Sequence, residues 1–356
     1  MENSTWVVGG IMSGSSLDGV DYTVSKFNYS KDKWTFNIQS TNTVPLPKHL
    51  VEELKKSDSY SIKKLKFLDD LYGRYLGEAV NKINKTQKLI PSIIGLHGHT
   101  VFHEPKRGFS TQIANASIIA NIINIEVISD FRNPNIGLGG QGAPLVPIGD
   151  KMLFESYKYC LNLGGIANIS SKESDGRILA FDISYCNQAL NYLANQLNLE
   201  YDNEGKIAES GKLDYELLKS LNSDPFLNLV GAKSLNNQDF KLKYKQNLDD
   251  CSSVANALFT YCEFISNHIS KFLVIEGSTC LVTGGGAFNS FLMGLLKSKT
   301  KVKIFVPSST IIESKESLIF AFLALLKKLN IPNVLAEYTG AQSDCISGTS
   351  YKPIEM

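Results

Sequence analysis

The hydrophobic pattern predicts the same order of strands in both halves of the chain. In the first half, an apolar run at 6–8 and an alternating run at 20–27 flank the glycine-rich stretch 9–21. Period-two alternation is typical of strands, and glycines with small hydroxyl residues between two strands are typical of a tight hairpin. A third strand is expected over 34–44, just before two prolines.

The second half repeats this order. Strands predicted over 159–163 and 166–171 surround Gly164 and Gly165, and a third strand over 178–181 leads to Asp182. A strand, a glycine turn and a second strand in both halves indicate two copies of one sheet topology.

Apolar residues at three- and four-residue spacing predict the helices. The predicted ranges are 49–56, 61–84, 117–125, 187–197, 204–212, 213–221, 252–271, 290–296 and 313–329, with short strands at 92–96, 127–129, 281–283 and 302–306. Two polar stretches show no such spacing. We interpret 130–144, rich in glycine, as a linker or cleft wall, and 231–248, rich in Asn and Lys, as a loop or lid.

A chain of 356 residues exceeds the size at which one hydrophobic core usually stops growing, so two domains are expected. The glycine-rich stretch sets the boundary. We predict an N-terminal domain of 1–129 plus 341–356 and a C-terminal domain of 130–340.

The first glycine turn has the composition of an anion-binding loop. Its glycines allow close approach of the backbone, Ser13 and its neighbours supply hydroxyls, and Asp18 and Asp21 are placed to orient Mg²⁺ or water. A hairpin with convenient turn residues explains it equally well. No Gly-Lys-Ser/Thr follows, which excludes a P-loop, and a strand rather than a helix follows, which excludes a dinucleotide fingerprint. By analogy of fold alone, the turn favours actin/hexokinase-like kinases.

Composition excludes several partner classes. Hydrophobic residues make up 43% of the chain and charged residues 20%, with a net charge of +1, so neither nucleic acid nor an anionic membrane is expected. We expect no membrane span and no signal peptide. The six cysteines form no Cys-x-x-Cys pair, which indicates reduced thiols and a cytoplasmic protein.

Two polar clusters follow predicted strands. His97, His99 and His103 lack the cysteines or carboxylates of a typical metal site, so ligand contact or structure is favoured over metal, and no metal site is predicted. Arg132 suits an anionic or polyhydroxylated ligand, although a structural salt bridge is comparably plausible.

Asp182 is the best candidate for a base, because a carboxylate at the end of a strand can project from a rigid element. A helix N-cap is the alternative. The glycines at 284–286 open a helix, whose N-terminus suits the phosphate or ribose of a nucleotide.

Together the motifs resemble those of the anhydro-N-acetylmuramic acid kinases, a family of the hexokinase/Hsp70/actin superfamily. The matching stretches are MSGSSLDGVD at 12–21, HGHTVFHEP at 97–105, DFR at 130–132, GGQGAPLVP at 139–147, LNLGGIANI at 161–169, GGGAFN at 284–289, ESLIFA at 316–321 and TGA at 339–341. The resemblance covers nearly the whole chain.

The resemblance implies an α/β fold with two ribonuclease H-like domains of the actin/hexokinase type and an interdomain cleft. It implies an enzyme of cell-wall (peptidoglycan) recycling that uses ATP and Mg²⁺. Such kinases open the 1,6-anhydro ring of a small sugar substrate with water and phosphorylate the freed 6-oxygen. It also implies a homodimer.

The resemblance also assigns roles to residues. Asp182 would activate water at the anomeric carbon, and Glu316 would be a second catalytic group. The residues expected to hold ATP are Ser13, Gly14, Ser15, Ser16, Leu17, Asp18, Gly19, Val20, Gly164, Gly165, Gly284, Gly285 and Gly286. Those expected to bind the sugar are His97, His99, Thr100, Arg132, Gln141 and Asn187.

The chain departs from the family pattern in three places. FDISYCN at 181–187 replaces Phe-Asp-Thr-Gly-Pro-Gly-Asn, AKSLNNQ at 232–238 replaces Pro-Lys-Ser-Thr-Gly-Arg-Glu, and His99 stands where Gln is expected. The second change removes a charged group. Two alternatives therefore stay open: a kinase for another sugar or sugar acid, and a sensor that binds nucleotide or muropeptide without turnover.

Overall fold

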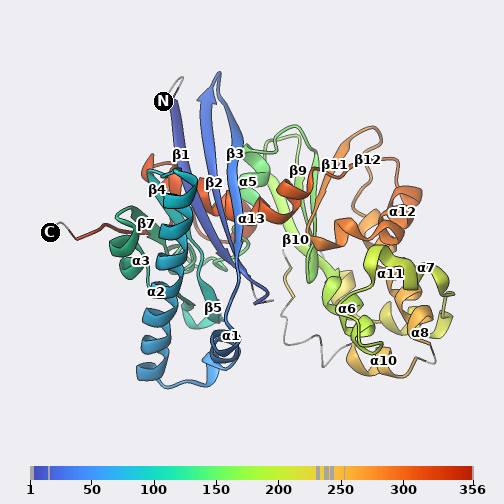
Figure 1. The fold of residues 1–356 in the computed structure, drawn as a ribbon. Helices are drawn as coiled ribbons and strands as arrows, with labels where there is room; N and C mark the ends of the chain where they lie inside the picture. Colours follow the sequence, from blue (N-terminus) through green and yellow to red (C-terminus); the bar gives the residue numbers. More distant parts are fainter. Residues whose placement is uncertain are drawn as a thin grey trace. The chain divides into compact units, whose positions relative to one another are not determined.

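The computed structural model describes residues 4–14, 17–229, 233–235, 240, 244–251 and 253–354. The chain divides into two compact units, the first made of Met1–Leu153 and Ser314–Met356 and the second of Phe154–Glu313. Two segments expected in the C-terminal domain, 130–153 and 314–340, lie in the first unit. Each unit is built on its own sheet (Figure 1).

The sheet of the first unit has the order β13-β7-β4-β1-β2-β3. Strands β1, β2 and β3 form an antiparallel meander, β4 and β7 run parallel to β1, and β13 pairs antiparallel with β7. The bounds are β1 Ser4–Ser13, β2 Val20–Ser30, β3 Lys33–Val44, β4 Ile93–Leu96, β7 Glu126–Ser129 and β13 Thr349–Tyr351. The predicted hairpin and third strand are thus confirmed, as is the return of the tail to the first unit.

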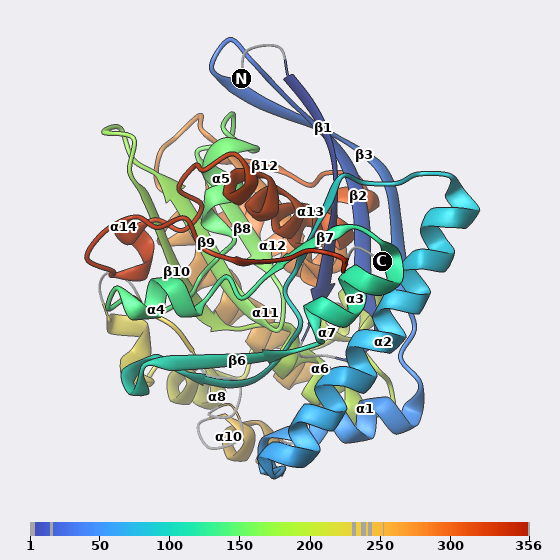
Figure 2. The same ribbon diagram turned by 90° about the vertical axis from the view of Figure 1, so that its left-hand side faces the viewer.

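Helices cover both faces of this sheet (Figure 2). Successive side chains of β1 and β2 point to opposite faces, and consecutive residues of both strands are buried, so each face needs a cover. On one face, Ile11 and Tyr22 pack in a core with Leu68, Tyr72 and Ile119 from two helices. The bounds in this unit are α1 Lys48–Lys55, α2 Ile62–Gln87, α3 Ala116–Ile123, α4 Asn133–Gly137, α5 Pro147–Met152 and α14 Ala336–Thr339, with the 3-10 turns η1 Ser57–Ser59 and η2 Pro105–Arg107. Helix α13, Ser309–Lys328, lies in this unit from Ser314 onward.

Helix α13 lies against the other face, where glycines allow its backbone to approach. A Cβ atom at Gly10 would lie 1.9 Å from Ser317 O, and one at Gly95 would lie 2.0 Å from Phe320 O. The Phe322 ring stacks on Phe27 with centroids 5.5 Å apart. Gly10 therefore serves the packing of a helix, and α13 from Ser314 onward belongs to the first unit for this reason.

The second sheet has the order β10-β9-β8-β11-β12, with β8, β9 and β10 antiparallel and β11 and β12 parallel to β8. Strands β3-β2-β1-β4-β7 of the first unit have the same order and the same directions, and this arrangement is the ribonuclease H-like topology. The predicted α/β fold class and its repeat are confirmed. The bounds are β8 Tyr159–Leu163, β9 Ile166–Lys172, β10 Ile178–Tyr185, β11 Thr279–Thr283 and β12 Lys303–Phe305.

Side-chain caps define the starts of several helices in the second unit. Asp214, Ser253 and Asn289 each accept a hydrogen bond from a backbone N–H three residues later, which satisfies one of the free donors of the first turn. The bounds are α6 Asn187–Asn195, α7 Lys206–Ser210, α8 Tyr215–Leu221, α10 Lys245–Asp249, α11 Val254–Ser270 and α12 Ser290–Lys299, with the 3-10 turns η3 Asn203–Gly205, η4 Pro225–Asn228 and η5 Gly285–Phe288.

The structure corrects two local predictions and adds a hairpin. The stretch 130–144 contains α4 and is packed, since the buried Asn135 donates to Thr339 Oγ1 at 3.0 Å. His99 and His103 lie in a two-stranded hairpin, β5 His99–Glu104 and β6 Phe109–Ile113, which the hydrophobic pattern did not predict. Asp182 lies inside β10 and not at the end of a strand.

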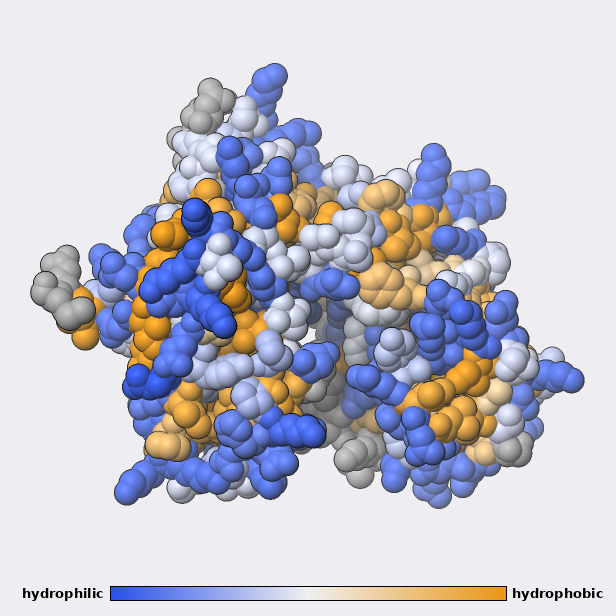
Figure 3. Space-filling view, in the orientation of Figure 1, coloured by the Kyte–Doolittle hydropathy of each residue, from blue (hydrophilic) through white to orange (hydrophobic). Residues whose placement is uncertain are grey.

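Polar side chains cover much of each unit on the face drawn in Figure 3, with smaller apolar patches between them. Among the helices that the structure describes, none has both the length and the apolar character to span a membrane.

Candidate active site

Arg132 and His97 meet in the first unit because they follow neighbouring parallel strands. His97 comes directly after β4, and Arg132 comes shortly after β7, so both lie at the carboxyl edge of the sheet. Arg132 Nη2 is 2.9 Å from His97 Nε2, and Nη1 donates to Gly142 O at 2.9 Å. Two residues predicted to bind the substrate are thereby brought into direct contact.

The His97 ring is neutral at physiological pH. Its complete burial, together with the nearby charge of Arg132, lowers its pKa to about 3. A neutral ring can accept the Arg132 hydrogen bond at Nε2 and must then carry its proton on Nδ1. The backbones of Ser13 and Gly98 lie near the ring, and Nδ1 has no hydrogen-bond partner within the described residues.

Arg132 has a donor that no described residue engages. Burial lowers the pKa of its guanidinium to about 10, against the opposing effect of Glu316, so the group stays charged at neutral pH. Its Nε atom is buried and has no hydrogen-bond partner in the part of the chain that the structure describes, and the same holds for His99 Nδ1. Buried polar atoms are normally paired, so each of these two atoms is a candidate for ligand contact.

Glu316, the second predicted catalytic residue, belongs to the same group of charges. Burial and the carboxylate of Asp21 raise its pKa, whereas Lys315 and Arg132 lower it. The next residue fixes the rotation of helix α13 about its own axis, because Ser317 Oγ is 2.7 Å from Thr23 Oγ1 of β2. Glu316 thus lies close enough to interact with both Arg132 and the exit of the glycine turn.

The glycine turn joins β1 to β2, and several of its side chains are used for packing. Ser13 Oγ is 2.7 Å from Tyr72 OH in the core, while Leu17 and Val20 are buried. Asp18 is exposed. The side chain of Ser13 is thus engaged in the fold of the first unit. Ser15 and Ser16 fall outside the described residues.

Asp182 in the second unit sits at an irregularity of β10. The register of β10 against β9 shifts between Asp182 and Ser184, and a bulge of this kind redirects a side chain. Burial raises the pKa of its carboxyl to about 6, with opposing effects of the Leu235 N–H and the Lys233 charge. Leu235 N donates to Asp182 Oδ2 at 2.8 Å. A buried carboxylate with a pKa just below neutrality is suited to act as a base.

The predicted nucleotide glycines and Asn187 form one cluster. Asn187 N donates to Gly164 O at 3.0 Å, and its Nδ2 donates to Leu163 O at 2.8 Å. Gly284 has φ 81°, and a Cβ atom there would lie 2.7 Å from Leu163 C. Asn187, predicted to contact the sugar, is therefore packed with residues predicted to contact ATP. The cluster also contains Gly165, Gly285 and Gly286.

Two further predicted substrate residues lie in the first unit. Thr100, in β5, accepts a hydrogen bond from Gln112 Nε2 at 3.4 Å. Gln141 is exposed, and its backbone N–H donates to Thr339 O at 2.8 Å.

Sequence comparison now places the chain. A profile of the family described as anhydro-N-acetylmuramic acid kinase matches residues 6–353. The anhydro-N-acetylmuramic acid kinase of Pseudomonas syringae pv. syringae is 33% identical over 361 residues, which cover 96% of this chain and 98% of the relative. That of Shewanella loihica is 34% identical over 362 residues, covering 95% and 96%. This chain belongs to the anhydro-N-acetylmuramic acid kinase family.

The solved structures that align with this chain are more distant in sequence. A ligand-bound xylulose kinase from Lactobacillus acidophilus aligns with 98% of this chain and 94% of its own, at 11% identity and a TM-score of 0.44. The activator of 2-hydroxyisocaproyl-CoA dehydratase from Clostridium difficile, with bound ADPNP, aligns with 91% of this chain and 97% of its own, at 10% identity and a TM-score of 0.40. Membership of the family rests on the sequence match.

The structure adds residues to the site that the sequence did not single out. Lys315, next to Glu316, forms an ion pair of 2.7 Å with Asp150 of α5, and both side chains are almost completely buried. The sequence signal that could have indicated a buried Lys315 is its position just before the long apolar stretch of the predicted helix 313–329. Lys233 is the other addition. Its backbone O accepts a hydrogen bond from Asp182 N–H, and its side-chain Nζ donates to Phe226 O.

Proposed function

We propose that this chain is an ATP-dependent kinase that hydrolytically opens 1,6-anhydro-N-acetylmuramic acid and phosphorylates O6, giving N-acetylmuramic acid 6-phosphate. The observation that carries the proposal is the family match over residues 6–353, supported by relatives of the same name over nearly their full length. In the cell this reaction would serve peptidoglycan recycling.

Asp182 is proposed as the base for ring opening. With a pKa of about 6, its carboxyl is mostly ionised at neutral pH and accepts a proton from water as the water oxygen bonds to the anomeric carbon. The bond from that carbon to O6 breaks, and O6 becomes the nucleophile toward the γ-phosphate of ATP. Water, sugar and ATP are consumed, and the sugar 6-phosphate and ADP are released.

The first unit is proposed to bind the sugar. Arg132 offers a buried Nε donor that no described residue of the chain pairs, beside the neutral His97 ring. A guanidinium recognises hydroxyl and carboxylate oxygens in a defined plane. His99, Thr100 and Gln141 complete this set. The pairing of Arg132 with His97 fixes the orientation of the guanidinium before the ligand arrives, which lowers the entropic cost of binding.

ATP is proposed to bind through two glycine-rich segments, Ser13–Val20 with its backbone groups and Gly284–Gly286 with its open turn. Gly165 and Gly285 are both exposed in the cluster with Asn187, so backbone groups there are accessible to a ligand. Nests of backbone N–H groups suit phosphate oxygens.

Mg²⁺ fits the acidic groups of the first unit. The carboxylate of Asp21 raises the pKa of Glu316, which shows that the two carboxylates are near enough to interact. Mg²⁺ is commonly held by one or two carboxylates together with substrate phosphates. When bound, it would neutralise charge on the transferring phosphoryl group, while Glu316 and Asp21 would hold it and Arg132 would orient the sugar.

We further propose a cytoplasmic homodimer. All six cysteines are free and five of them are buried, as suits a reducing compartment. The dimer follows from the family resemblance, and light scattering of the purified protein tests it.

The decisive experiment is incubation of the full chain with ATP, Mg²⁺ and 1,6-anhydro-N-acetylmuramic acid, followed by mass spectrometry and ³¹P NMR. The expected product is N-acetylmuramic acid 6-phosphate with one equivalent of ADP. Phosphorylation only of other sugars would assign a different substrate, and saturable binding without ADP release would assign a sensor. Either outcome would overturn the proposal.

A further inference from the structure

Lys233 bonds to two separate elements of the second unit. Its backbone O accepts Asp182 N–H at 2.9 Å, and two residues later Leu235 N–H donates to Asp182 Oδ2 at 2.8 Å. Its side chain reaches the short helix η4, where Nζ donates to Phe226 O at 3.1 Å and to Leu227 O at 3.4 Å. The segment 233–235 is therefore attached to β10 through its backbone and to η4 through one ammonium group.

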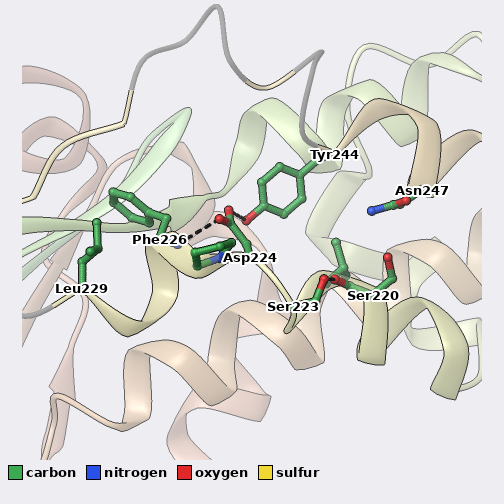
Figure 4. A pocket seen from close by; sticks show the side chains of 9 residues that line it. Ser220, Ser223, Asp224, Phe226, Leu229, Tyr244 and Asn247 are labelled. Carbon is green, nitrogen blue, oxygen red and sulfur yellow. Dashed lines mark hydrogen bonds between the residues drawn. The ribbon is translucent and has the colours of Figure 1, made fainter.

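Helix η4 is itself fixed by polar contacts. Asp224 Oδ1 accepts Phe226 N–H at 2.9 Å, and its Oδ2 accepts the Tyr244 hydroxyl at 2.6 Å, as Figure 4 shows. The Lys233 ammonium lies 4.6 Å from the centroid of the Phe226 ring, a favourable cation–π distance. Phe226, Asp224 and Tyr244 also line a cavity of about 460 Å³. The Phe226 side chain is buried and Leu227 packs against the core of the second unit, so η4 is held by both apolar packing and these polar contacts.

The contacts form a closed path back to the strand that carries Asp182. The Tyr244 ring packs edge-to-face on Tyr185, with centroids 5.2 Å apart, and Tyr185 is the last residue of β10. Asp182 is thus linked to η4 at two points, through Lys233 on one side and through Tyr185 and Tyr244 on the other.

We propose that Lys233 is a positioning residue for Asp182: its ammonium holds segment 233–235 on η4, and the backbone of that segment fixes the Asp182 carboxylate. This inference rests on the proposed function, because it takes Asp182 as the base. Lys233 acts through Asp182 and Leu235 and is assigned no contact with substrate.

The charges around Lys233 add an electrostatic consequence. Lys233 interacts favourably with Asp182 and Asp224 and unfavourably with Lys271. His268, also near Lys233 and Lys271, has its pKa lowered to about 4 by burial and by these two charges, so it is neutral above pH 5. Lys233 is the charged group that lowers the pKa of Asp182 against the effect of burial. Loss of the ammonium should therefore raise that pKa.

Lys233→Met tests the proposal, because it keeps the length of the side chain and removes the donor and the charge. We expect kcat for ring opening and phosphorylation at pH 7 to fall about tenfold or more, with the KM for ATP within about twofold of wild type. The acidic limb of the kcat profile should move up by about one pH unit. A difference infrared titration measures Asp182 directly, through the carboxyl band that Asp182→Asn removes, and its midpoint should rise equally.

Three variants complete the test. Lys271→Met removes a neighbouring ammonium that does not bond to η4, and it should leave the Asp182 midpoint and kcat near wild type. Lys233→Arg keeps charge and donors and should restore most of kcat. Lys233→Gln keeps a donor without charge, and it replaces the Met variant if that protein does not fold.

A Lys233→Met protein with wild-type kcat and a wild-type Asp182 titration would overturn the inference. The infrared titration needs no turnover, so it also separates this inference from the proposed function. If the wild-type chain does not phosphorylate the anhydro sugar, the function fails; if the Asp182 midpoint still moves in Lys233→Met, the positioning role stands.

Discussion

Arg132 Nη2 lies 2.9 Å from Nε2 of a His97 ring that burial keeps neutral. The pair joins the ends of two parallel strands, and the buried Arg132 Nε has no partner among the residues that the structure describes. A guanidinium already held by Gly142 O and by an imidazole has little freedom to lose when a ligand binds.

The first prediction follows from this pair. Arg132→Lys replaces a planar fork by a single ammonium that cannot keep both contacts and still face a ligand. We expect the KM for the anhydro sugar to rise about tenfold or more, corresponding to roughly 1.4 kcal/mol, with the KM for ATP little changed. Arg107→Lys, at an exposed ion pair with Glu104, is the matched control and should behave as wild type. An unchanged sugar KM in Arg132→Lys would remove Arg132 from the binding site.

The second prediction concerns Asp182→Asn, which removes the proposed base but keeps an oxygen for the Leu235 N–H. We expect kcat to fall by about 10²–10⁴ while sugar binding, measured by calorimetry, stays near wild type. Asp175→Asn, at an exposed ion pair with Arg177, serves as the control and should leave kcat unchanged. A wild-type rate in Asp182→Asn would rule out the assigned role.

The third prediction is the pH dependence of the wild-type rate. A base must be ionised to accept a proton, and burial raises the pKa of Asp182 to about 6, well above the ordinary value of 3.8 for an aspartic acid. Activity should therefore fall roughly tenfold per pH unit below about pH 6. The kcat of the chemical step, measured by rapid quench, checks this. A rate that is level down to pH 4.5 would contradict both the pKa and the role.

The fourth prediction concerns the effect of the Asp182 carboxyl on the free energy of unfolding. Its folded-state pKa is raised above the unfolded value, so between about pH 4 and 6 the folded state binds more protons than the unfolded state, and stability falls as pH rises through this range. Asn mimics the protonated form. Asp182→Asn should therefore raise the free energy of unfolding at pH 7.5 by about 1–3 kcal/mol, and by much less at pH 4.

Urea unfolding of both proteins at the two pH values measures this difference. Equal stability gains at pH 4 and at pH 7.5 would show that the burial of charge at Asp182 is not the cause. A gain in stability together with loss of activity is the pattern expected when a functional group is held in an unfavourable setting.

The fifth prediction concerns the buried ion pair Lys315–Asp150, whose side chains are only 5% and 4% exposed. Asp150→Ala leaves an ammonium inside the protein without its carboxylate, and we expect a loss of about 3–5 kcal/mol. The double variant Asp150→Ala/Lys315→Met removes both charges and should recover most of this loss. A double variant no more stable than Asp150→Ala would show that the pair is not coupled.

Several elements could be predicted because their signals are local. The alternation over β2 and β3, the glycines of both turns and the apolar spacing of α2 and α11 each depend on residues close in the chain, and these elements formed as expected. The order strand, turn, strand, strand in both halves was also readable, and the topology of both sheets follows it. The family motifs were local in the same sense.

Other predictions failed because distant residues decide them. Asp182 lies inside β10 because that strand continues past it to Tyr185 and because segment 233–235 pairs with it, about fifty residues away in the chain. The stretch 130–144 is packed because Asn135 finds Thr339, and α13 belongs to the first unit because Gly10 and Gly95 admit its backbone. No pattern within these segments reveals such partners.

Sequence by itself determined the repeated strand order, the glycine turns and the family to which the chain belongs, because hydrophobic period and turn chemistry act between near neighbours along the chain. Only the tertiary structure decided that Arg132 meets His97, that Lys315 is buried against Asp150 and that Lys233 spans β10 and η4. These contacts depend on how separate elements pack, and packing sets burial, which in turn moves the pKa values of His97, Asp182 and Glu316.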